Sequence, residues 1–157
     1  MAAGLAVALT ACSSSGQKSD AEGGNPFLSE YTTPFGVPPF DQIKFADYKP
    51  AFLQGIEEES REIEAICNNT EEPTFENTIA AMDQAGPLLR KVSSVFYGLN
   101  SANTTDEIQE LSRELSPILS KHGDDINLNP TLFARVKAVY DKRESLNLDK
   151  EQAKLLE

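Results

Sequence analysis

Apolar residues recur at intervals of three and four positions along most of the chain after residue 46. This spacing places them on one face of an α-helix, whereas strands would show sustained alternation of apolar and polar residues, which no segment has. The sequence therefore predicts an all-α fold in which short connections join antiparallel helices. The predicted helices cover residues 47–66, 75–99, 105–122, 130–140 and 149–157.

The predicted core consists of the apolar stripes of these helices, because an amphipathic helix buries its apolar face. In chain order the stripes contain Tyr48, Phe52, Ile56, Ile63 and Ile66; Phe75, Ile79, Met82, Leu89, Val92, Phe96 and Leu99; Ile108, Leu111, Leu115, Ile118 and Leu119; and Leu132, Phe133, Val136, Val139 and Tyr140. Glutamates cover the other side of the first helix and are expected to form a solvated face: Glu57, Glu58, Glu59, Glu62 and Glu64.

Capping residues predict where the helices begin, because their side chains can accept hydrogen bonds from the free N–H groups of a first turn. The predicted caps are Asp47 (with Pro50 in the first turn), Thr74, Thr104 in a capping box with Glu107, Asn129 before Pro130, and Asp149 with Gln152.

Proline and glycine predict where the helices bend or end. Pro87 has no N–H for the carbonyl of Asp83, so the Gly86-Pro87 pair is expected to kink the second helix. Pro117 is a second candidate for a kink, and Gly123 has the character of the residue that follows a helix C-terminus.

The first 25 residues have the features of an export address rather than of a fold. Residues 2–11 are small or apolar, and Leu9-Thr10-Ala11-Cys12 resembles a bacterial lipobox. We therefore expect a signal peptide at 1–11, lipidation of Cys12 and a flexible polar tether at 12–25. No Lys or Arg precedes the apolar run, so either the true start lies upstream or the signal is weak. The alternative is a misplaced start codon with a chance cysteine.

Residues 26–46 form a different kind of segment, with four prolines and four phenylalanines. The prolines favour extended backbone. The phenylalanines indicate an arm that packs against a surface, and residues 47–157 then form a helical domain that is incomplete at its C-terminus.

The charge of the chain limits its partners. Formal net charge is −11 and the pI is about 4.5. Nucleic acid is not expected as a partner, since phosphate binding needs a basic surface. An exported bacterial lipoprotein would instead be anchored to a membrane through its lipid, facing the periplasm or the cell exterior.

Candidate catalytic and metal-binding residues are few. His122 lies near Asp124 and Asp125, which would suit either a cation site or a histidine at a helix C-terminus, and the second interpretation is favoured. Cys67 is expected to be a small buried hydrophobe. The sequence has no His-Glu-x-x-His, phosphate loop, Cys-x-x-Cys or nucleophile elbow, so we assign no catalytic and no metal residue in this chain.

Several runs of residues resemble the N-terminal part of the M3 family of zinc metallopeptidases, most closely its bacterial peptidyl-dipeptidases. The most telling are Pro34-Phe35-Gly36-Val37-Pro38-Pro39-Phe40, Tyr48-Lys49-Pro50-Ala51-Phe52 and Pro73-Thr74-Phe75-Glu76-Asn77-Thr78-Ile79. The resemblance extends over about residues 25–157. It implies part of a two-lobed, mostly helical enzyme that removes C-terminal dipeptides from short peptides in a deep channel.

The same resemblance implies zinc as the cofactor of the whole enzyme, bound by a His-Glu-x-x-His helix and a further glutamate. None of those positions exists in this sequence. We therefore expect the chain to help wall the substrate channel, to bind no zinc and to be inactive alone. Two origins remain open: a truncated record of the peptidase, which the ending inside a helix favours, or a stand-alone helical binding or interaction module.

Overall fold

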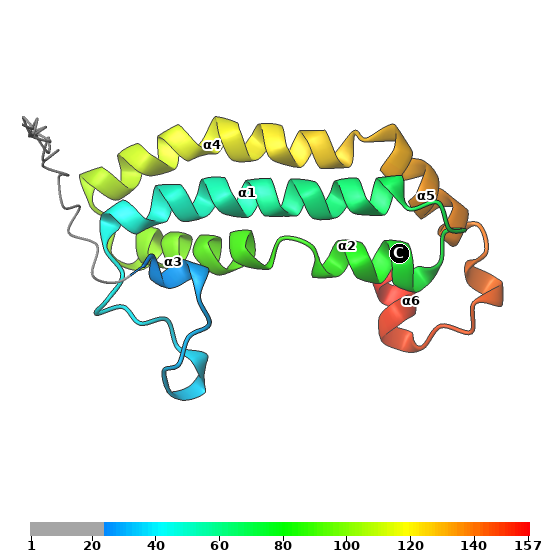
Figure 1. Ribbon diagram of the computed structural model, residues 1–157, viewed down its shortest axis with the longest axis horizontal. Coiled ribbons are helices and arrows are strands. Elements are labelled where there is room, and N and C mark those ends of the chain that lie inside the picture. The colour runs from blue at the N-terminus through cyan, green and yellow to red at the C-terminus, as the bar shows by residue number, and fades with distance from the viewer. Residues whose placement is uncertain (1–23) are drawn as a thin grey trace, which may run out of the picture.

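The computed structural model describes residues 24–157, and within this range it contains helices and no strand, as predicted. The long helices are α1 (Phe45–Asn68), α3 (Pro87–Ala102) and α4 (Asp106–Asn127). Helix α1 lies between α4 on one side and α2 with α3 on the other (Figure 1). The shorter elements are η1 (Pro26–Leu28), η2 (Pro34–Gly36), η3 (Phe75–Ala80), α2 (Ala81–Gln84), α5 (Pro130–Tyr140), η4 (Arg143–Ser145) and α6 (Lys150–Leu156).

Three of the predicted helix starts are confirmed by hydrogen bonds that backbone N–H groups donate to the capping side chains. Thr74 accepts a bond from the Asn77 N–H at 3.0 Å. Asn129 accepts bonds from the N–H groups of the first turn of α5, and Asp149 does the same for α6. These starts follow from bonds that span only two or three residues, which is why the sequence alone located them.

The prediction of Asp47 as the N-cap of α1 is wrong. The helix begins at Phe45 after the cap residue Lys44, and the Asp47 carboxylate accepts the Lys44 N–H at 2.7 Å. Asp47 is thus the third residue of a capping arrangement, and Pro50 lies inside the helix rather than in its first turn.

The predicted boundaries of α4 are also wrong at both ends. Thr105, not Thr104, caps the helix and accepts the Ile108 N–H, so Glu107 takes no part in a capping box. The helix continues past Gly123 to Asn127, and Pro117 does not interrupt it. Gly123 is an interior helical residue because the carbonyls around it keep their helical partners.

The Gly86-Pro87 pair produces a break instead of the predicted kink. Phe75–Ala80 form a π-helical turn, α2 ends at Gln84, and Ala85 is extended at ψ 150°. Gly86 then adopts a left-handed conformation at φ 71°, and Pro87 starts α3 as its first residue. A proline at the first helical position sacrifices no hydrogen bond, so two helices replace one.

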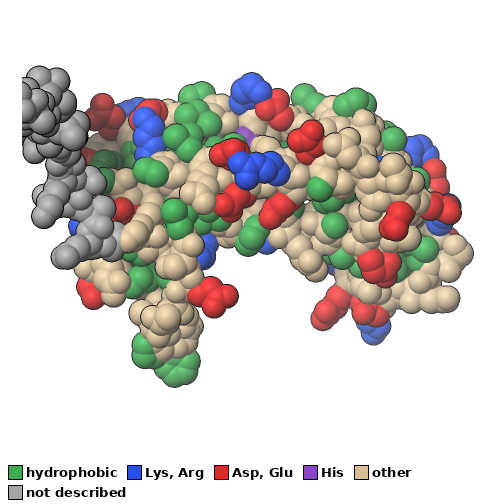
Figure 2. Space-filling model, viewed as in Figure 1, with side chains coloured by type: hydrophobic (Ala, Val, Ile, Leu, Met, Phe, Trp, Pro, Cys, Tyr) green, Lys and Arg blue, Asp and Glu red, His purple; other side chains and the backbone are tan. Residues whose placement is uncertain are grey.

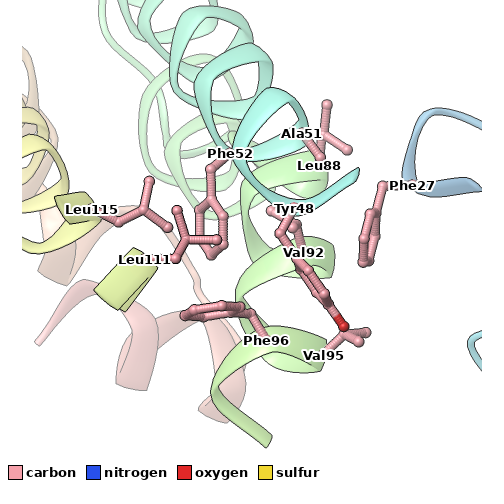
Figure 3. Close-up of a cluster of buried hydrophobic side chains, with 10 residues drawn as sticks. All are labelled: Phe27, Tyr48, Ala51, Phe52, Leu88, Val92, Val95, Phe96, Leu111 and Leu115. Atoms are coloured by element: carbon pink, nitrogen blue, oxygen red, sulfur yellow. The ribbon is translucent and has the colours of Figure 1, made fainter. Parts of the chain in front are cut away.

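The largest core cluster lies where α1, α3 and α4 meet. Phe52, Phe96, Val92 and Leu115 are fully buried there. Phe96 packs edge-on against Tyr48 and Phe52, with ring centroids 5.3 and 5.4 Å apart, and the three rings lie together in Figure 3. Burial raises the pKa of the Tyr48 phenol.

The stripe predicted for α5 is only partly buried. Leu132 and Val139 are buried, in two smaller clusters near the far ends of α1 and α6. Phe133 and Tyr140, by contrast, are 66% and 41% exposed. Arg135 lies on the same face as Leu132 and Val139 and is 7% exposed. The neighbours of α5 therefore cover only part of its predicted apolar stripe.

The segment 26–46 packs through its first residues and projects through its later ones. Phe27 is fully buried against Tyr48, with ring centroids 5.3 Å apart. The Lys91 ammonium donates to the carbonyls of Phe27 and Ser29, each at 3.0 Å, and stacks over the Tyr31 ring. Beyond Tyr31 the chain leaves the helices and forms the projecting loop around η2 in Figure 1.

Candidate functional site

The predicted surface position of His122 is wrong, because α4 does not end beside it. The imidazole is 8% exposed, and its Nε2 lies 2.7 Å from Oε2 of Glu59 on α1. Its Nδ1 lies 3.5 Å from the Ser60 hydroxyl. The histidine therefore joins two helices from within the protein.

The two aspartates after His122 do not converge on it. Asp125 pairs with Lys121 one turn earlier, at 2.5 Å. Within residues 24–157 no group of three His, Cys, Asp or Glu side chains is placed to hold a metal ion. The donor set around His122 consists of one carboxylate and one hydroxyl, which does not fit zinc, whose protein sites supply at least three ligands.

The glutamate face of α1 is not wholly solvated, contrary to the prediction. Glu59 holds His122, and the Glu62 carboxylate accepts the Gly86 N–H at 2.7 Å. A Cβ atom at Gly86 would lie 2.5 Å from Cδ of Glu59. Glu59 thus attaches α4 to α1, and Glu62 attaches the α2–α3 break to α1. Glu57 is exposed, as expected, and forms an ion pair with Arg61.

Arg135 is a second buried polar centre, which the sequence analysis did not identify. Its guanidinium donates to the carbonyls of Asn69 at 2.7 Å and Glu71 at 3.3 Å, and to side chains of Asn77 and Thr78. Asn69 and Glu71 belong to the connection between α1 and η3, whereas Asn77 and Thr78 belong to η3 itself. A cue existed in the sequence, since position 135 lies on the same helix face as Leu132 and Val139.

Cys67 is half-buried and packs beside Ile63 and Ile66, which agrees with a small core hydrophobe. At the surface nearby, a hydrogen bond from Lys142 lowers the pKa of Glu72.

Cys12, the predicted lipidation site, lies outside the described residues. No helix among residues 24–157 is long and apolar enough to cross a membrane.

Three polar contacts hold the helices of the described residues together. The contacts of His122 with Glu59, of Glu62 with Gly86, and of Arg135 with its carbonyls each connect elements that are distant in sequence. His122, Gly86 and Arg135 are buried, whereas Glu62 is exposed. Because buried polar groups are costly unless paired, these contacts favour one arrangement of the helices. The candidate functional feature of this segment is a rigid helical surface.

Comparison with known proteins identifies relatives for most of the chain. It is 47% identical over 133 residues to dipeptidyl carboxypeptidase of Escherichia coli and 44% identical to that of Salmonella typhimurium, which covers 85% of this chain in each case. Oligopeptidase A of Escherichia coli matches at 23% identity over a region of the same length. No family model matches the chain.

The matches cover only part of each relative. The chain spans about 20% of the length of the dipeptidyl carboxypeptidases and 19% of that oligopeptidase A. The two relatives at 47% and 44% identity are named dipeptidyl carboxypeptidase, and the resemblance of the sequence runs had implied the removal of C-terminal dipeptides. The predicted resemblance is thereby confirmed: this chain is similar, over 133 residues, to about one fifth of the length of these dipeptidyl carboxypeptidases.

Proposed function

We propose that this chain is the N-terminal helical part of a zinc-dependent peptidyl-dipeptidase that removes C-terminal dipeptides from short peptides. The observation that carries the proposal is the 47% identity to dipeptidyl carboxypeptidase over 133 residues. The described residues do not fit a zinc site, because His122 is buried against Glu59 and no second nitrogen ligand exists. Zinc and the activation of water would then belong to the remaining part of the enzyme.

The role proposed for the segment itself is to wall the substrate channel. Helices α1, α3 and α4 share one core, and polar contacts fasten the α2–α3 break to α1 and α5 to the connection that follows α1. A wall of this kind restricts a channel by shape, since a close-packed core resists deformation. The alternative of a stand-alone binding module has no similar support, because the matched proteins are named as peptidases.

An exchange of segments tests the proposal. In the dipeptidyl carboxypeptidase of Escherichia coli, the 133 matching residues would be replaced by those of this chain. We expect the chimaera to release dipeptides from the C-terminus of short peptides and to lose this activity on treatment with a metal chelator. Chromatography of the cleavage products measures the release.

Two further proteins complete this experiment. The 157-residue chain alone is expected to release no dipeptide, and the enzyme without the segment shows what the segment contributes. A chimaera that is folded by circular dichroism but releases no dipeptide would contradict the proposal. Chelator-sensitive cleavage by the chain alone would contradict the proposal that zinc and the catalytic activity belong to the remaining part of the enzyme.

We further propose that Cys12 is lipidated and anchors an exported protein to a bacterial membrane, facing the periplasm or the cell exterior. The support is the lipobox-like Leu9-Thr10-Ala11-Cys12 and the polar residues that follow it. Acyl chains are sufficient to hold a protein at a membrane without a spanning helix.

Replacement of Cys12 by alanine is expected to move the protein from the membrane fraction to the soluble fraction of a bacterial host. The acceptor for the lipid is the thiol, so no anchor forms without it. Fractionation followed by immunoblotting measures the distribution, and Cys67→Ala provides a matched control that should stay with the membrane. Wild-type protein that is already fully soluble would show the interpretation to be wrong.

A further inference from the structure

We propose that the loop Thr33–Phe40 is a preformed docking loop that packs against the remaining part of the peptidase. This inference rests on the proposed function, which supplies that remaining part. The loop is not needed to attach the segment 26–46 to the helices, because Phe27 and Lys91 already hold that segment in place.

The loop exposes apolar side chains that a free surface would not favour. Phe35 is fully exposed, and Val37 and Phe40 are about half-exposed, at 49% and 53%. No charged residue lies between Tyr31 and Phe40, although the chain carries a net charge of −11. Figure 2 shows apolar side chains gathered at the tip of this projection. Clustered exposed apolar residues mark interaction sites.

The loop is also held in an unfavourable backbone conformation. Phe35 has φ 61° and ψ 14°, a left-handed conformation that is uncommon for a bulky residue. The Gly36 N–H donates to the Thr33 carbonyl at 3.1 Å, and the Thr33 hydroxyl donates to the Val37 carbonyl. Strain of this kind persists where the surroundings enforce it and is concentrated at functional sites.

Prolines and one buried contact hold the loop in place at its base. Pro34 fixes the backbone before Phe35, and Pro39 is buried between the half-buried Pro38 and the exposed Phe40. The Pro39 carbonyl accepts bonds from the N–H groups of Gln42 and Ile43, at 2.9 and 3.1 Å. A loop ordered in advance loses little conformational entropy when it binds, which favours a docking role over a flexible linker.

The remaining part of the peptidase is the occupant that the molecule favours. The chain matches only about 20% of the length of its relatives, so the remaining part of the proposed peptidase would be large. The loop and α6 both lie on the side of α1 opposite to α4 (Figure 1), and the outline between them is recessed (Figure 2). A partner seated against this edge would cover Phe35 and meet the C-terminal helix. An uncharged loop on an acidic protein requires an apolar counterpart.

The test compares one substitution in two settings. Phe35→Ser is made in the 157-residue chain and in the chimaera with dipeptidyl carboxypeptidase, and Phe133→Ser, which is 66% exposed on α5, serves as the matched control. In the chain alone, Phe35→Ser should leave the melting temperature unchanged. In the chimaera it should lower the temperature of half-inactivation by roughly 2–4 °C, because the docked ring is lost, whereas Phe133→Ser should have no effect.

Three results would overturn the proposal. The first is Phe35→Ser without effect in an active chimaera, which refutes docking and leaves the proposed function intact. The second is a 157-residue chain that forms dimers in gel filtration and becomes monomeric on Phe35→Ser, while the same substitution leaves the chimaera unaffected. The loop would then bind a second copy of the chain instead of the remaining part of the peptidase. The third is an unsubstituted chimaera that folds but releases no dipeptide, which refutes the proposed function and removes the partner with it.

Discussion

Replacement of Phe96 by alanine is expected to lower the free energy of unfolding by about 3–5 kcal/mol. The Phe96 ring is fully buried and packs edge-on against Tyr48 and Phe52, at centroid distances of 5.3 and 5.4 Å. The loss combines the transfer of the ring to water with the cavity left between α1 and α3. Urea unfolding followed by circular dichroism at constant temperature measures the difference.

Phe133→Ala is the matched control for this prediction. The same side chain is removed, but Phe133 is 66% exposed on α5, so the free energy of unfolding should change by no more than about 0.5 kcal/mol. The apolar stripe of α5 predicted that Phe133 belongs to the core, whereas the packing leaves it outside. Equal losses at positions 96 and 133 would show that α5 is covered in a way that the structure lacks.

Gly55→Ala is expected to be the second most damaging of these substitutions, with a loss of about 2 kcal/mol. A Cβ atom at this position would lie 2.8 Å from the Leu89 nitrogen and 2.9 Å from its Cα. These are backbone atoms, so no side-chain rotation relieves the contact and α1 must move away from α3. The loss should exceed the gain of about 1 kcal/mol that alanine brings to a helix interior. Thermal unfolding with calorimetry measures the balance.

Gly123→Ala tests the same chemistry where there is space. Gly123 lies inside α4, and no atom lies within 4 Å of an added Cβ. Alanine should therefore stabilise the protein by about 0.5–1 kcal/mol. A gain at both glycines would mean that α1 and α3 are not in close contact. A loss at Gly123 would mean that the helix ends there, as its sequence had indicated.

Local features of the fold could be predicted without the structure because they depend on near neighbours in the chain. The spacing of apolar residues predicts helices, and the caps Thr74, Asn129 and Asp149 bond to N–H groups two or three residues away. Runs such as Pro73-Thr74-Phe75-Glu76 likewise predicted a resemblance to peptidases, and the similarity to dipeptidyl carboxypeptidase confirms it. Each of these inferences needs only residue order and short-range hydrogen bonding.

The candidate site depended on contacts between residues that are far apart in the sequence. Glu59 and Glu62 resemble their solvated neighbours in sequence, yet they bind His122 and Gly86 because α4 and the α2–α3 break lie against α1. Arg135 is buried because carbonyls from the α1–η3 connection surround it.

Burial depends on which helix faces pack against each other. A periodic pattern of apolar residues predicts that a helix has an apolar face, but not which other element covers it. The sequence therefore specified the helices, most of their caps and the family to which they are related. Tertiary packing decided which phenylalanines are covered, which glutamates are structural, and that Phe35 stands exposed on a strained loop. The reason is that hydrogen bonding within a helix is local, whereas the exclusion of water requires a second surface.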